Sequence, residues 1–242
     1  MAEPRTVPVE LLKVSAKEAG TKPTREEVAL EARVRLFVDG SLAALLMSTP
    51  VELRELAVGY LYSEGLIDGP SDVEVSIDGL DVHASLRPRR ERPLAPVRSD
   101  LVVEVGTVLR GMEALEFSSR TYRRTGGTHT AALMSPEGDV VAVAEDVGRH
   151  NALDKAVGKA LLAGRQLGYC FAVFTGRLSY EVVLKVVRCG IPLISSISAP
   201  TSLGIELAEE HRVSLVGFAR RGSFNVYTHP WRLGLASPKR HG

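Results

Sequence analysis

The stretch EDVGRHNALDK, residues 145–155, decides the fold prediction because it joins a buried strand to a helix. The run before it, Val140 to Ala144, is apolar, whereas seven of the eleven residues in the stretch are polar or ionisable. Apolar residues then recur at helical spacing, at Ala152, Leu153, Ala156, Val157, Ala160 and Leu161. A strand therefore delivers charged groups to the start of a helix, which is where α/β proteins bind ligands.

The same alternation of strand and helix continues on both sides of this stretch. Strands are expected at 130–134, 140–144, 170–174, 191–194 and 214–218, and helices over 103–118 and after His150, Ser179 and Thr201. This order predicts an α/β domain of right-handed crossover units around a mainly parallel sheet.

The first part of the chain has a different pattern. Strand-like runs flank Asp39-Gly40 and Asp78-Gly79, which predicts two hairpins, at 32–47 and 72–86. The segment Thr49-Pro50-Val51-Glu52 is typical of a helix start, with Thr49 as the N-cap, and Gly65 is expected to end that helix. A small α+β unit is therefore expected.

Four segments follow from these patterns. Residues 1–25 are polar without a sustained period and are expected to be flexible. A small α+β domain over 26–99 ends in the arginine- and proline-rich segment Arg87–Arg98, either a solvated connection or an anion-attracting loop. The α/β domain is expected over 100–233, followed by a tail over 234–242.

Composition excludes several classes of function. The 242 residues carry a net charge of +1, so no overall field attracts nucleic acid or anionic membranes. No apolar run is long enough to span a bilayer, and the N-terminus has no signal-peptide pattern. Two isolated cysteines, Cys170 and Cys189, indicate a reducing compartment, so a cytoplasmic protein is expected.

Polar and glycine residues gather where the predicted strands end, at 125–129, 145–155, 175–179 and 195–202. Glycines let backbone N–H groups approach a ligand, and Arg149 and Arg177 can hold phosphate. Together the four ends suit a phosphorylated or nucleotide-like ligand, although each alone is also typical of a capped helix. The later segment 217–223, with two arginines and two glycines, is either an anion-binding loop or a surface turn.

The two histidines in this region, His129 and His150, allow two interpretations. His150 lies four residues before Asp154, so the two can pair on one helix face, either to lock the helix start or to act as a general base. A metal site is not predicted, because the H-x-E and C-x-x-C motifs of the zinc deaminases are absent.

Several long motifs resemble one known family, the formate dehydrogenase accessory proteins (FdhD/NarQ). They are LRELAVGYLYSEGLI (53–67), RTGGTHTAAL (124–133), EDVGRHNALDK (145–155), GRLSYEVVLKVVRCGIPLISSISAPTSLGIELAE (176–209) and LVGFARRGSFNVYTHPWRL (215–233). The resemblance covers about residues 28 to 233.

This resemblance implies a homodimer with a cytidine-deaminase-like three-layer C-terminal domain that lacks the deaminase zinc. It implies a sulfurtransferase role in maturing molybdenum or tungsten formate dehydrogenases. In the family, a cysteine accepts sulfur as a persulfide from a cysteine desulfurase and passes it to the bis(molybdopterin guanine dinucleotide) cofactor. That cofactor is cargo and not a permanently bound group, so a GDP-like fragment is expected to bind.

The resemblance also implies a set of binding residues. The family's cofactor-binding stretch matches Phe218, Ala219, Arg220, Arg221, Gly222 and Ser223. Candidate neighbours at the other strand ends are Gly126, Gly127, His129, Asp146, Arg149, His150, Arg177 and Ser179.

The chain departs from the family pattern in one respect. The C-x-x-C motif that the family carries before the TGG motif is missing, because the region 87–103 contains no cysteine. A persulfide requires a thiolate, and Cys189 is either a substitute carrier or an inert core residue. Three hypotheses remain: a cofactor-binding protein that also passes sulfur, a cofactor-binding chaperone without sulfurtransferase activity, and a zinc-free deaminase-like or hydrolytic enzyme acting through His129 and His150.

Overall fold

The computed structural model of the chain describes residues 5–15, 20–88 and 93–236. Its strands and α-helices are β1 (Thr6–Ser15), β2 (Gly20–Ala29), β3 (Ala32–Val38), β4 (Ser41–Ser48), α1 (Leu53–Ser63), β5 (Val73–Asp78), β6 (Asp81–Leu86), α2 (Val105–Ser118), α3 (Arg120–Thr125), β7 (His129–Met134), β8 (Val140–Asp146), α4 (Arg149–Leu162), β9 (Phe171–Phe174), α5 (Tyr180–Arg188), β10 (Leu193–Ser196), α6 (Ser202–Glu210), β11 (Ser214–Arg220) and β12 (Ser223–Val226). Part of the arginine-rich segment (89–92) and most of the predicted tail (237–242) lie outside the described residues.

The larger sheet has six strands in the order β12-β11-β10-β9-β7-β8. Strands β9, β10 and β11 run parallel, whereas β7 pairs antiparallel with both β8 and β9, and β12 pairs antiparallel with β11. The expectation of a mainly parallel sheet is therefore wrong. The short turns between β7 and β8 and between β11 and β12 can join only antiparallel neighbours.

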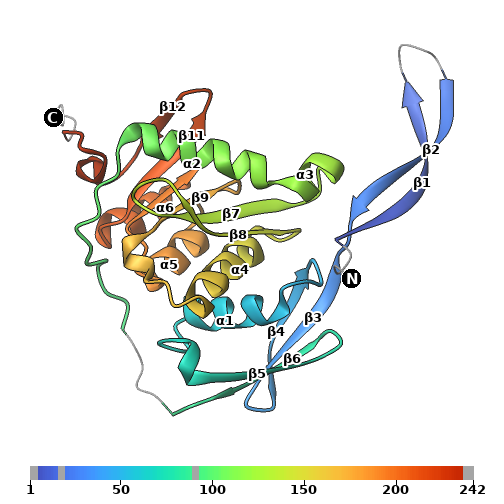
Figure 1. Cartoon of the computed structure of the whole chain (residues 1–242), viewed down its shortest axis with the longest axis horizontal. Coiled ribbons are helices and arrows are strands. Elements are labelled where there is room, and N and C mark those ends of the chain that lie inside the picture. Colours follow the sequence, from blue (N-terminus) through green and yellow to red (C-terminus); the bar gives the residue numbers. More distant parts are fainter. Residues whose placement is uncertain (1–4, 16–19, 89–92, 237–242) are drawn as a thin grey trace.

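Helices cover both faces of this sheet (Figure 1). Because side chains alternate along a strand, Ala131 and Leu133 of β7 face one layer while Ala132 and Met134 face the other. The first layer contains α4, α5 and α6, and the second contains α2. The sheet is thus the middle of three layers, buried on both sides.

The smaller sheet has the strand order β4-β3-β6-β5 and is covered by α1 (Figure 1). Its two hairpins confirm the predicted turns, since Asp39, Gly40 and Gly79 all adopt the positive φ angles that such turns need. Helix α1 packs on its other side against α4, so it lies between the small sheet and the large one.

Two glycines allow α1 and α4 to cross at very short range. A Cβ atom added to Gly59 would lie 1.8 Å from the carbonyl oxygen of Asp154, and one added to Gly158 would lie 1.9 Å from that of Glu55. The two backbones therefore touch directly, in a way that no larger residue permits.

The start of α1 differs from the prediction. The helix begins at Leu53, after Glu52 in the left-handed conformation (φ 58°), and Thr49 does not cap it. Thr49 instead bonds to the larger domain: its N–H donates to Asp146 and its carbonyl accepts from Lys155. Tertiary contacts thus override the local capping preference, while the predicted end at Gly65 (φ 74°) is confirmed.

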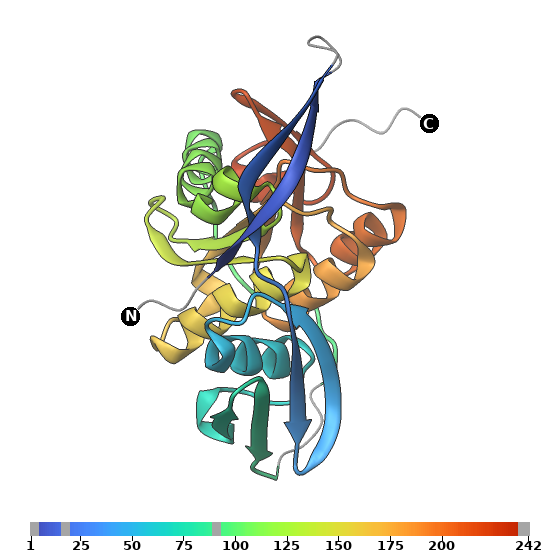
Figure 2. The same ribbon diagram turned by 90° about the vertical axis from the view of Figure 1, so that its right-hand side faces the viewer.

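Much of the segment that was expected to be flexible forms strands, which the sequence did not predict. Strands β1 and β2 pair in register from Thr6–Ala29 to Ser15–Gly20 and form a ribbon, here called the N-terminal arm, that protrudes from the body (Figures 1 and 2). Its root packs on α3 and on Gly127 just beyond that helix, where an added Cβ atom would lie 3.0 Å from the Cβ atom of Ala29. Both faces of the arm mix apolar and charged residues, so the sequence carries no clear two-residue period.

Candidate functional site

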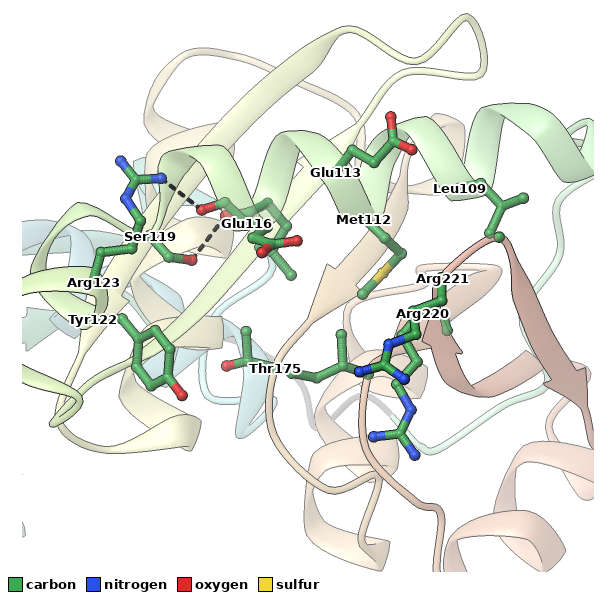
Figure 3. Close-up of a pocket in the computed structure, with 14 residues that line it drawn as sticks. Leu109, Met112, Glu113, Glu116, Ser119, Tyr122, Arg123, Thr175, Arg220 and Arg221 are labelled. Atoms are coloured by element: carbon green, nitrogen blue, oxygen red, sulfur yellow. Dashed lines mark hydrogen bonds between the residues drawn. The ribbon is translucent and has the colours of Figure 1, made fainter. Parts of the chain in front are cut away.

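A cavity of about 560 Å³ lies between α2 and α3 on one side and the carboxyl ends of β9, β10 and β11 on the other. This strand-end cavity is lined by Leu109, Met112, Glu113, Leu115, Glu116, Ser119, Tyr122, Arg123, Thr175, Ile197, Ala219, Arg220, Arg221 and Gly222. Figure 3 shows Arg220 and Arg221 at one end, Tyr122 and Arg123 at the other, and Thr175 between them. Open α/β sheets bind ligands at this edge.

The arginines lie at the hairpin between β11 and β12, where Arg220 ends β11 and Arg221 is the first of the two turn residues. Arg220 pairs with Ser223, and Arg221 and Gly222 between them both have positive φ, at 52° and 79°. Positive φ at both positions is what a two-residue hairpin turn requires, as at Asp39-Gly40. Neither arginine forms an ion pair with another described residue, so both guanidinium groups are available to an anion.

The structure shows the form of the segment 217–223, whose predicted anion binding stays a prediction. The segment is a β-hairpin, because β11 continues through Phe218 to Arg220 and β12 begins at Ser223. A bulge between Gly217 and Arg220 gives Phe218 a positive φ of 55° and changes the register ahead of the turn. Phe218 and Ser223 therefore flank the cavity without lining it.

Helices α2 and α3 supply the wall that sequence reasoning missed. Leu109, Met112, Glu113 and Glu116 recur at spacings of three and one, which places them on one face of α2. The spacing is visible in the sequence, but it does not reveal that this face looks onto the strand ends. Helix α3 was not predicted, because its six residues are too few to show a period.

Glu145 holds α3 in place. Its carboxylate accepts the backbone N–H groups of Thr121 (2.9 Å) and Tyr122 (3.0 Å), which begin the helix. A carboxylate at this end satisfies two free donors and complements the helix dipole. Glu145 thereby positions Tyr122 and Arg123 at the cavity without entering it.

Asp146, a candidate ligand residue, is fully buried away from the cavity. Its carboxylate accepts from Ser48 (2.7 Å), from the Thr49 N–H (3.1 Å) and from the ammonium of Lys155 (2.5 Å), which is also fully buried. Burial lowers the pKa of Lys155, and Asp146 opposes that shift. Asp146 therefore joins the two sheets of the molecule, and its carboxylate is bound by groups of the chain itself.

His129 lies directly behind the cavity wall. Its Nδ1 is 3.2 Å from the hydroxyl of Thr175, which lines the cavity. Burial lowers the pKa of His129 and the nearby Arg149 lowers it further, which favours the neutral ring. The Nε atom of Arg149 is buried and has no hydrogen-bond partner among the described residues.

His150 belongs to a different cavity, of about 340 Å³, between α1, α4 and α5. Its Nε2 is 3.6 Å from Glu181, and burial followed by Arg149 lowers its pKa. The predicted pairing with Asp154 is wrong, because that buried carboxylate is bound by Ser63 (2.7 Å) and Lys185 (3.0 Å). His129 and His150 thus do not share a site.

The remaining candidates lie at helix ends outside the strand-end cavity. Gly126 closes α3 in the left-handed conformation, and Gly127 packs against the arm. Arg177 is exposed, and Ser179 precedes α5 as its N-cap residue, with a buried hydroxyl that has no partner among the described residues. The four strand ends therefore do not form one site, and the structure brings Ala219, Arg220, Arg221 and Gly222 together with Thr175 and Ile197.

Both cysteines are buried and neither forms a disulfide. Burial raises the pKa of the Cys170 thiol, which disfavours the thiolate. Among the described residues, no cluster of three metal-ligating side chains occurs. No helix in the described part of the chain is long and apolar enough to cross a membrane.

Comparison with solved structures finds a close match. A crystal structure described as a candidate formate dehydrogenase accessory protein from Desulfotalea psychrophila superimposes with a TM-score of 0.85 at 28% identity. The match covers 95% of this chain and all of that one, so the whole fold is shared.

Sequence comparisons agree with this match. The chain is 35% identical to the sulfur carrier protein FdhD of Sulfolobus acidocaldarius, over 93% of this chain and 98% of that protein. It is 39% identical to the protein of the same name from Saccharolobus solfataricus, over 78% and 83% of the two chains. The sequence profile of the FdhD/NarQ family matches residues 29–98 and 79–234. The chain therefore belongs to the FdhD/NarQ family.

Proposed function

We propose that this chain is an accessory protein of formate dehydrogenase maturation that binds the bis(molybdopterin guanine dinucleotide) cofactor in the strand-end cavity. The relatives are named sulfur carrier proteins, and the solved relative is described as a formate dehydrogenase accessory protein. The cofactor is cargo in this proposal, and a formate dehydrogenase is the client.

The cavity has the chemistry that a guanine dinucleotide needs. Its volume of about 560 Å³ lies within the range of small-molecule sites. Arg220 and Arg221 at one end and Arg123 at the other suit phosphate oxygens, which arginine binds in a forked geometry. Apolar side chains such as Met112 and the ring of Tyr122 suit the flat faces of a base or pterin.

The observation that carries the proposal is the end of the β11–β12 hairpin, where Arg220 and Arg221 both line the cavity and neither forms an ion pair with another described residue. Titration with GDP, a fragment of the cofactor, tests it. We expect Arg220→Ala/Arg221→Ala to weaken GDP binding by about tenfold or more, since each charged hydrogen bond contributes about 1.5–3 kcal/mol.

The matched control is Arg25→Ala/Arg54→Ala, which removes the same charge from two exposed positions. This control should bind GDP like the wild type. Equal GDP affinity in the cavity variant and the wild type would reject the cavity as the cofactor site.

The buried cysteines favour a chaperone without a persulfide of its own. Cys170 and Cys189 are 5% and 3% exposed, and neither lines the strand-end cavity. A thiol must be accessible and ionised to accept sulfur from a cysteine desulfurase. In this proposal the chain carries the cofactor, and any sulfur reaches it from a thiol of another protein.

Labelled sulfur separates the two functions. The chain is incubated with a cysteine desulfurase and labelled cysteine, and protein-bound persulfide is then measured. We expect no label on the protein while GDP binding remains. Label that disappears in Cys170→Ala or Cys189→Ala would instead establish a sulfur carrier.

Three further parts of the proposal rest on the family resemblance. They are a homodimer, a cytoplasmic location and a cytidine-deaminase-like C-terminal domain without zinc. The order β8-β7-β9-β10-β11 between helical layers supports the last of these. The deaminase-like enzyme is less well supported, because His129 and His150 lie at different cavities.

A further inference from the structure

A second large cavity, of about 540 Å³, lies at the opposite edge of the six-stranded sheet. It is lined by Val97, Arg98, Ser99, Asp100, Leu101, Gly168, Tyr169 and Arg212, and is called here the arginine cavity. Tyr169 and Arg212 shortly precede β9 and β11. The arginine cavity is therefore at the amino ends of the parallel strands, whereas the strand-end cavity is at their carboxyl ends.

Positive charge dominates the lining of the arginine cavity. Arg98 and Arg212 are both exposed, and neither forms an ion pair with another described residue. Asp100 is the one carboxylate among the described residues that line it. The two guanidinium groups are therefore free to bind an anion from solvent.

A third arginine lies directly behind the wall. Arg232 is fully buried, and its guanidinium donates to the carbonyl oxygens of Ser99 (2.5 Å), Leu101 (3.3 Å) and Arg212 (3.2 Å). All three acceptors are neutral, and its Nε atom has no hydrogen-bond partner among the described residues. The guanidinium carbon also lies 4.1 Å from the centroid of the Trp231 ring.

The charge of Arg232 is thus met by carbonyl oxygens and an aromatic ring, and by no ion pair with another described residue. Burial, with a further contribution from Arg212, lowers its pKa to about 10, and Asp100 opposes this only in part. Burying a cation without a counter-ion is costly, so a nearby anion would stabilise the folded state.

We propose that the arginine cavity binds an oxyanion, phosphate or carboxylate, between Arg98 and Arg212. Both guanidinium groups can donate to it directly, and the buried charge of Arg232 adds to the attraction behind the wall. The three carbonyl contacts explain how Arg232 fixes the segment from Ser99 to Leu101. They do not explain why two more arginines converge on the same cavity without partners.

The site is independent of the proposed cofactor site. It shares no residue with the strand-end cavity, and the sheet separates the two. The oxyanion could belong to a small phosphorylated ligand or to acidic side chains of a partner protein, and two probes distinguish these sources.

The experiment uses the full chain carrying Arg220→Gln/Arg221→Gln, so that the strand-end cavity does not compete. Pyrophosphate and a hexaglutamate peptide are titrated separately by calorimetry at low salt. We expect at least one probe to bind, and its binding to weaken by about tenfold or more when Arg98→Gln/Arg212→Gln is added. Adding Arg25→Gln/Arg54→Gln instead, with the same loss of charge, should leave that binding unchanged.

The outcomes separate clearly. If only the binding of pyrophosphate weakens in the Arg98→Gln/Arg212→Gln variant, the ligand is a small phosphorylated molecule. If only the binding of the peptide weakens, the ligand is an acidic segment of a partner protein. If neither probe depends on Arg98 and Arg212, the arginine cavity is not an oxyanion site. Circular dichroism of each variant checks that the fold is retained.

Discussion

Glu145 and Asp146 are neighbours in the chain, yet their carboxylates stabilise different parts of the molecule. Glu145 binds the start of α3 beside the cavity, whereas Asp146 binds the β4–α1 junction and Lys155. The charged stretch that suggested a ligand site therefore serves mainly to join elements. Buried carboxylates with several donors are typical of such structural junctions.

Asp146→Asn tests this role. The substitution leaves the Lys155 ammonium buried without its counter-ion, so we expect the free energy of unfolding to fall by about 3–5 kcal/mol. Urea denaturation measures the change. Adding Lys155→Met removes the unpaired cation and should recover part of the loss.

Asp139→Asn, in the exposed turn between β7 and β8, is the control and should change stability by less than about 0.5 kcal/mol. A similarly small effect of Asp146→Asn would mean that the buried pair does not hold the junction.

The two histidines predict a dependence of stability on pH. Burial lowers the folded-state pKa of both His129 and His150 below the ordinary value of 6.5. As the pH falls through about 6.5, the unfolded chain takes up protons that the folded chain does not, so the free energy of unfolding decreases.

The double variant His129→Gln/His150→Gln lacks this contribution. Its urea midpoint should fall less than that of the wild type between about pH 7.5 and about pH 5.5. Equal slopes for the two proteins would show that the histidines titrate alike in the folded and unfolded states.

At the scale of elements, the crossing of α1 and α4 makes a sharp prediction. An alanine at Gly59 or Gly158 would place its Cβ within 2 Å of a backbone carbonyl oxygen. Backbone cannot move aside as a flexible side chain can, so we expect each substitution to reduce the free energy of unfolding by about 3 kcal/mol or more.

Gly69→Ala is the matched control, since a Cβ there meets nothing within 4 Å. Thermal unfolding followed by circular dichroism compares the three variants. Wild-type stability in Gly158→Ala would mean that the helices can separate without cost.

The elements that sequence reasoning predicted are those with a strong period or a specific turn. The hairpins at Asp39-Gly40 and Asp78-Gly79 and the helices α2, α4, α5 and α6 all have such signals. The missed elements lack such signals. Helix α3 has only six residues, and the strands of the arm do not alternate between apolar and polar residues. Thr49 was misassigned because its best partners, Asp146 and Lys155, are about a hundred residues away.

The candidate site was predicted only in part for a related reason. Arg220 and Arg221 were found from the two arginines and two glycines that follow a strand and from the family motif that contains them, and they line the cavity. Glycines and hydroxyl residues at strand ends serve both for helix capping and for ligand binding, so the sequence does not tell which of the two roles each residue has. The face of α2 that lines the cavity was missed because the helical spacing of its residues does not show which element that face packs against.

At the scale of the whole molecule, the N-terminal arm makes little contribution to the core. The three hydrophobic clusters are all formed by residues after the arm, from Val34 onward. Deletion of residues 1–29 should therefore leave a cooperatively folded protein. We expect its free energy of unfolding to change by only about 1 kcal/mol, mainly through the lost Arg5–Glu52 ion pair.

Urea denaturation of the truncated and full chains measures this change. A non-cooperative transition or a loss of several kcal/mol would show that the arm supports the body.

The contacts of Asp146 and the glycine crossing of α1 with α4 have a consequence for protein engineering. The small sheet and the large one share buried charges and a backbone-to-backbone interface, so a fragment that kept only the cavity-bearing half would expose both. Transfer of the cavity to another scaffold would therefore require nearly all of the protein except the N-terminal arm, about residues 30–234, as one unit.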